Sequence, residues 1–125
     1  MNQSDRMNSA SNGWEADPWD ASDAVADLQL EGFQIRAAKA VSWSAISLVE
    51  GPIFGHDIEW LNSLEVEYVA THDLEDWLLM RLVYHGFPDP PEWRLATRAA
   101  GKFSHPWNSW GYFAQLPDAW KIPGI

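Results

Sequence analysis

The side chains best suited to chemistry are the histidines and the carboxylates that follow two of them. His56 and His72 each precede an Asp directly and a Glu three positions on. A metal site needs at least three converging ligands, commonly two His at i and i+4 on a helix or a Glu-x-x-His pair. Neither HExxH nor ExxH occurs in the chain. The sequence therefore predicts no metal site.

The motifs of common catalytic sites are also missing. The chain has no G-x-S-x-G nucleophile elbow, no phosphate loop and no G-x-G-x-x-G fingerprint. The two glycines of Gly51-Pro52-Ile53-Phe54-Gly55 flank a proline and bulky side chains, which is typical of a turn. Without cysteine, the chain has no disulfide, thiolate nucleophile or cysteine-ligated metal. We predict no catalytic residue and no cofactor, and keep a small enzyme using a His/carboxylate pair as an alternative.

Charge is distributed unevenly along the chain. The first 80 residues hold fifteen acids and three bases, whereas the last 45 hold three acids and five bases, for a net charge of −10. This sign argues against direct binding of nucleic acid. Two interpretations stay open: the acids keep a tryptophan-rich protein soluble, or they engage a basic partner.

Nine tryptophans in 125 residues are an excess whose placement matters. Trp43, Trp60, Trp77 and Trp93 fall on segments that resemble core elements, so we predict that they are buried. Four others follow no periodicity, and for them core packing and interface contact are equally supported. They are Trp14, Trp19, Trp107 and Trp110.

Three basic residues, Arg94, Arg98 and Lys102, are spaced by four and would share one face of a helix. They either pair with acids of the same chain or form a docking ridge for an acidic group. Together with the unexplained tryptophans and two acids of the tail they form the predicted partner-binding set. This set is Trp14, Asp17, Trp19, Asp20, Arg94, Arg98, Lys102, Trp107 and Trp110.

The elements that must position these residues are predicted to be mainly α. Residues 1–20 read as a flexible acidic tail, and residues 21–125 as a single domain of four to five short helices. Capping residues and apolar spacing place the helices at 22–32, 33–49, 57–62, 73–85 and 89–100. Residues 64–70 alternate like a strand, which leaves room for one short strand pair, and an irregular aromatic and proline-rich strap follows from residue 102.

The sequence resembles no family closely enough to name one. No apolar segment reaches the roughly 20 residues that cross a bilayer, and the first residues lack the apolar stretch of a secretory signal. We therefore expect a cytoplasmic, non-enzymatic protein that binds a larger, basic or nucleic-acid-binding protein, as an accessory subunit or stoichiometric inhibitor of the immunity or anti-defence type. A structural or assembly component of a larger complex is the alternative, and the oligomeric state stays open.

Overall fold

The computed structural model describes residues 23–82 and 92–124, and its main element is a five-stranded antiparallel sheet. The strands follow the chain order β1-β2-β3-β4-β5 across the sheet. Their bounds are β1 Ser44–Ala45, β2 Val66–His72, β3 Glu75–Leu82, β4 Glu92–Ala99 and β5 Asn108–Phe113. The described helical elements are α2 Asp23–Ala37, the short 3-10 helix η1 Ile46–Leu48, and α3 Ile58–Ser63. The prediction of a mainly α fold is therefore wrong.

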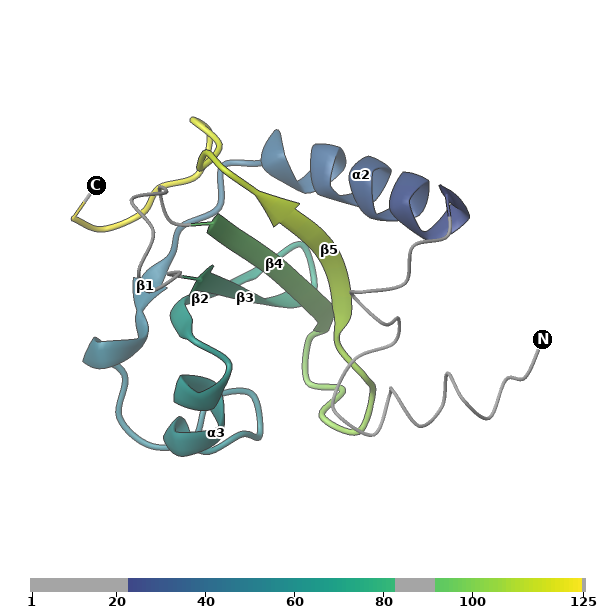
Figure 1. Ribbon diagram of the computed structural model, residues 1–125. Helices are drawn as coiled ribbons and strands as arrows, with labels where there is room; N and C mark the ends of the chain where they lie inside the picture. The colour runs from purple at the N-terminus through teal and green to yellow at the C-terminus, as the bar shows by residue number, and fades with distance from the viewer. Residues whose placement is uncertain (1–22, 83–91, 125) are drawn as a thin grey trace.

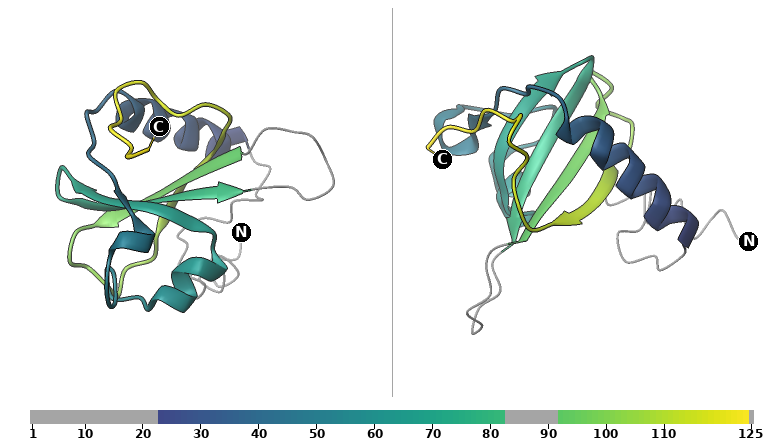
Figure 2. Two further views of the ribbon diagram at one scale, coloured as in Figure 1. Left: turned by 90° about the vertical axis from the view of Figure 1, so that its left-hand side faces the viewer. Right: turned by 90° about the horizontal axis from the view of Figure 1, so that it is seen from above.

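Both faces of the sheet are covered (Figures 1 and 2). Helix α2 lies along one face, and α3 lies across the other. The core on the α2 side gathers Val41, Trp43, Ala70, Trp77, Leu79, Trp93, Leu95 and Trp120. The core on the α3 side gathers Ile53, Leu61, Val66, Val69, Leu78, Met80, Ala96 and Trp107. Successive residues of β3 alternate between these two cores, as the period of a strand requires.

Two segments predicted as helices, 73–85 and 89–100, form β3 and β4 over their described residues. In β3 five successive residues from Asp76 to Met80 are buried. A strand buried on both faces is a continuous apolar run, so its sequence cannot be told from a buried helix by periodicity. Asp73 is not a helix cap. It lies in the two-residue turn of the β2–β3 hairpin, where His72 pairs with Glu75.

The first predicted helix also differs, because α2 continues through Gly32 to Ala37. A Cβ at Gly32 would lie 2.1 Å from Cζ3 of Trp110. The glycine therefore permits close approach of a ring and does not end the helix. The helix predicted over 33–49 is absent after Ala37, where a short strand and η1 follow.

Other expectations are confirmed. The helix expected at 57–62 corresponds to α3, in which Asp57 accepts a hydrogen bond from the backbone N–H of Trp60 at 2.8 Å. The preference for a strand at 64–70 corresponds to β2. The strap expected from residue 102 is wrong in part, because it contains the regular strand β5, although its aromatic residues do pack against the core on the α2 side. In the described residues, no helix combines the length and the apolar character needed to cross a membrane.

Candidate binding site

Three loops meet at one end of the sheet. The β2–β3 turn at 73–74 and the β4–β5 loop at 100–107 leave the sheet at the same end, because the strands are consecutive and antiparallel. The backbone N–H of Ala100 donates to the carbonyl of Leu74 at 2.9 Å and joins these two loops. The turn at 53–56, which precedes α3, is the third. We call this region the loop-end surface and define it by Leu74, Phe103, His105 and Pro106, with Asp57 and Glu59 beside them.

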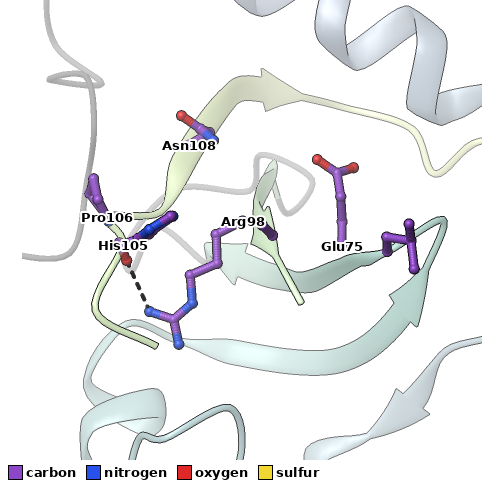
Figure 3. Close-up of a pocket in the computed structure, with 7 residues that line it drawn as sticks. Glu75, Arg98, His105, Pro106 and Asn108 are labelled. Atoms are coloured by element: carbon purple, nitrogen blue, oxygen red, sulfur yellow. Dashed lines mark hydrogen bonds between the residues drawn. The ribbon is translucent and has the colours of Figure 1, made fainter. Parts of the chain in front are cut away.

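Arg98 holds the loops together from beneath. It is 2% exposed and lies near the end of β4 on the α3 side. One guanidinium nitrogen donates to the carbonyls of Phe103 at 3.3 Å and His105 at 3.2 Å, and the other donates to the carbonyl of Phe54. Figure 3 shows the guanidinium turned toward the His105 carbonyl. Arg98 thus fixes the backbone of two loops that are about 50 residues apart in the sequence.

Burying this cation is costly, since a guanidinium loses its hydration. Its Cζ lies 4.2 Å from the ring centroid of Trp107, a cation–π contact that offsets part of the cost. Asp76, its cross-strand neighbour, is 4% exposed and supplies an opposite charge. Burial nevertheless lowers the pKa of the Arg98 guanidinium, and Asp76 opposes that shift. A buried charge is therefore used here to set the shape of surface loops.

A second cluster supports the same loops. Trp107 is fully buried and donates its indole N–H to Nε2 of His56 at 3.0 Å. The His56 ring stacks on Trp60 with centroids 3.7 Å apart and planes inclined by 15°. Burial, followed by the charge of Arg98, lowers the pKa of His56, while Asp57 opposes the shift. A neutral imidazole is needed here, because protonated Nε2 could not accept the bond from Trp107.

A pocket of about 310 Å³ opens between the hairpin and the β4–β5 loop (Figure 3). Its lining residues are Leu74, Glu75, Arg98, Ala99, His105, Pro106 and Asn108. In Figure 3, Glu75 lies across the pocket from His105 and Pro106. The pocket thus combines polar groups with the side chain at the tip of the hairpin.

The carboxylate in this pocket is already engaged. Glu75 receives two hydrogen bonds from Arg36 of α2, at 3.1 and 2.7 Å, and one from Thr97 at 3.3 Å. Arg36 in turn lies 4.0 Å above the ring of Trp110. These contacts dock α2 on the sheet, so we assign Glu75 a structural role. Among the described residues, no three His, Cys, Asp or Glu side chains are placed to hold a metal ion.

Two apolar side chains project from the loop-end surface. Leu74 is 86% exposed and Phe103 is 54% exposed. Leu74 follows Asp73 in a turn where both residues have positive φ, 50° for Asp73 and 62° for Leu74. A two-residue hairpin of this kind favours Asn-Gly or Asp-Gly, and leucine in the left-handed region is strained. The fold therefore holds an exposed leucine where stability alone favours glycine.

Phe103 rests against the turn that leads into α3. A Cβ at Gly55 would lie 2.9 Å from Cδ2 of Phe103, so the ring covers the backbone of this glycine. Asp57 and Glu59, at the start of α3, are exposed and follow Gly55 closely in the chain. Two exposed carboxylates therefore lie at the start of the helix that follows the turn beneath the ring.

The structure separates the predicted partner-binding residues. Arg94 and Arg98 do not lie on a helical face but on one face of β4, and both are buried. Lys102 is exposed in the β4–β5 loop. Trp107 is fully buried, whereas Trp110 is half-buried and donates its indole N–H to Thr97 at 2.7 Å. The four predicted residues of the tail, Trp14, Asp17, Trp19 and Asp20, lie outside the described residues.

Sequence reasoning missed Leu74 and Phe103. Leu74 read as part of an apolar helical stripe, and Phe103 as one aromatic residue of a packed strap. A usable signal was present: His72-Asp73-Leu74-Glu75 separates two runs with strand character by two residues. The turn at Asp73 and Leu74 lacks the glycine that usually marks a two-residue hairpin in a sequence.

The chain matches no protein-family model, no curated protein and no solved structure. Its function is therefore argued from the geometry and charge described above.

Proposed function

We propose that this chain is a non-enzymatic protein-binding protein whose partner presents a basic surface. One observation carries the proposal: in the described part of the chain, exposed carboxylates outnumber exposed cations that could neutralise them. Seven exposed acids there have no ion pair with another described residue, namely Asp27, Glu31, Glu50, Asp57, Glu59, Glu65 and Asp118.

The basic side chains are largely used within the fold. Arg36 pairs with Glu75, and Lys39 with Asp73. Arg81 lies 3.8 Å from a carboxylate oxygen of Glu67. Arg94 and Arg98 are buried, so of the described bases only Lys102 and Lys121 are exposed without an ion pair. Such an imbalance produces a negative field that accelerates association with a cationic surface.

An accessory subunit and a stoichiometric inhibitor, of the immunity or anti-defence type, both satisfy this description. In the inhibitor version, carboxylates occupy a groove that otherwise receives phosphates or acidic peptides. A cytoplasmic location belongs to the same proposal and is compatible with a chain that has no cysteine. A structural role in a larger assembly is the second candidate. The exposed Leu28, Leu30 and Ile35 of α2 favour it, because exposed apolar side chains are covered in an assembly.

The test is capture by the immobilised full chain from a lysate of its native host at 50 mM salt, followed by elution with 500 mM salt. A neutralised variant carries Asp27→Asn, Glu31→Gln, Asp57→Asn and Glu59→Gln. Its α3 cap is kept, because asparagine is as good an N-cap as aspartate. The matched control replaces both exposed lysines, Lys102→Gln and Lys121→Gln.

We expect a basic protein that the wild type and the lysine control retain, that salt releases, and that the neutralised variant loses. A captured protein that 500 mM salt does not release and that the neutralised variant still retains contradicts the proposal. Self-association of the purified chain with no salt-sensitive partner favours the structural candidate instead.

A further inference from the structure

We infer that the loop-end surface is the contact site for the basic partner, with Leu74 and Phe103 as apolar anchors and Asp57 and Glu59 as flanking charges. This inference rests on the proposed function and gives it a location. The occupant is a protein surface that carries Lys or Arg around an apolar centre.

The backbone that carries the anchors is fixed by hydrogen bonds, which lowers the entropic cost of binding. The carbonyls of Phe103 and His105 are fixed by Arg98, and the carbonyl of Leu74 by Ala100. On the other side of the turn, the indole N–H of Trp77 donates to the carbonyl of His72 at 3.1 Å, and Lys39 pairs with Asp73. The Leu74 side chain therefore projects from a turn whose backbone is fixed by hydrogen bonds on both sides.

The placement of leucine is the second argument. A strained residue that contributes no packing is retained for a reason other than stability. Leu74 is 86% exposed, so its side chain adds little to the core. It also borders the 310 Å³ pocket, which gives a partner side chain a recess beside the anchor.

Charge complementarity identifies the partner. Asp57 and Glu59 are exposed, have no ion pair among the described residues and lie next to the turn on which Phe103 packs. Asp73, the exposed carboxylate of the hairpin, pairs with Lys39, which lowers its pKa, so it adds no net charge to this region. Lys102 is the opposing cation in the β4–β5 loop. A cationic surface with an apolar centre therefore fits this region better than an acidic one.

A defined probe tests the location. The probe is a synthetic 12-residue peptide of alternating lysine and leucine, titrated at 50 mM salt into the ¹⁵N-labelled full chain, with a glutamate–leucine peptide as the charge control. We expect the largest amide shift changes at residues 55–59, 73–75 and 101–105.

Replacing both anchors, Leu74→Ser and Phe103→Ser, should weaken binding of the lysine peptide about tenfold, which is about 1.4 kcal/mol for the pair, since a few anchor side chains carry most of the binding energy of an interface. The matched control is Leu48→Ser. Leu48 is 80% exposed on η1, which follows β1 toward the start of β2 and so lies away from the hairpin. Binding by this variant should stay within twofold of the wild type.

Two outcomes overturn the inference in distinguishable ways. Shift changes confined to the outer face of α2, at residues 27–35, refute the location and leave the proposed function standing. Equal binding of the lysine and glutamate peptides refutes both.

Discussion

Replacing Leu74 by glycine should stabilise the fold while it removes an anchor. Leu74 has a φ of 62°, and an L-residue in the left-handed region costs about 1–2 kcal/mol. Glycine removes that strain but adds backbone freedom to the unfolded chain, which costs about 0.5–1 kcal/mol. Almost no packing is lost, because the side chain is 86% exposed. We expect a net gain of about 0.5–1 kcal/mol in the free energy of unfolding.

The measurement is urea unfolding followed by tryptophan fluorescence, with the midpoint compared at an unchanged m-value. Leu74→Ala is the matched control, since alanine removes the side chain but keeps a Cβ at positive φ. Its stability should match the wild type within experimental error. An equal gain in both variants contradicts backbone strain as the cause, and a loss of stability on Leu74→Gly shows that the leucine packs in the fold. Leu74→Gly should also weaken binding of the lysine–leucine peptide.

Three further changes have definite expected results. Arg98→Met leaves the carbonyls of Phe54, Phe103 and His105 without their donor, so the free energy of unfolding, measured with heat or urea, should fall by about 2–4 kcal/mol. Limited proteolysis of this variant should cut first within 100–107, and a fall below about 0.5 kcal/mol contradicts the organising role of Arg98. The pKa of His56 is lowered from 6.5 in the folded state, so its contribution to stability is present above pH 6.5 and is lost as the pH falls through the lowered folded-state pKa. Unfolding curves at several pH values should therefore show a smaller drop in stability at low pH for His56→Gln than for the wild type. Identical pH profiles contradict the assignment. Gly32→Ala forces a Cβ against Trp110 and should lower the free energy of unfolding by about 1–2 kcal/mol, in spite of the better helix propensity of alanine. A variant more stable than the wild type means that the Trp110 ring moves aside freely.

The sequence predicts the local elements whose signals are not shared by another structure. Ile58 and Leu61 have the spacing of three that a helix requires, and α3 forms there. Val66 to Tyr68 begins an alternating run that β2 confirms. Burial of Trp43, Trp77 and Trp93 also follows from their segments, although the segments are not all of the predicted type.

The prediction of the fold class fails at the two central strands, β3 and β4. In β3 and β4 side chains are buried on both faces, so Trp77 to Met80 form an unbroken apolar run that satisfies a helix as well. The charged residues around the run, Asp73 before it and Arg81 after it, then imitate helix capping. Only the pairing of these segments with distant strands distinguishes a strand from a helix. The resulting sheet has α2 on one face and α3 on the other, so both faces of its strands are buried.

The candidate site could be predicted only in part. The spacing of Arg98 predicts a helical face, whereas its importance comes from its burial beneath two loops. Phe103 and His105 follow Arg98 closely in the chain, but Phe54 precedes it by 44 residues, so only the fold shows that Arg98 joins two loops. The excess of acids is visible in the sequence, but the internal use of Arg36, Lys39 and Arg98 emerges from the fold.

The salt dependence of binding tests the central claim, that exposed carboxylates attract a basic partner. The dissociation constant of the full chain and its captured basic partner should be measured at 50, 150 and 500 mM salt. Because the screening length falls from about 14 Å to about 4 Å over this range, we expect the dissociation constant to rise at least about tenfold. A dissociation constant that stays within about twofold over the whole range contradicts the claim.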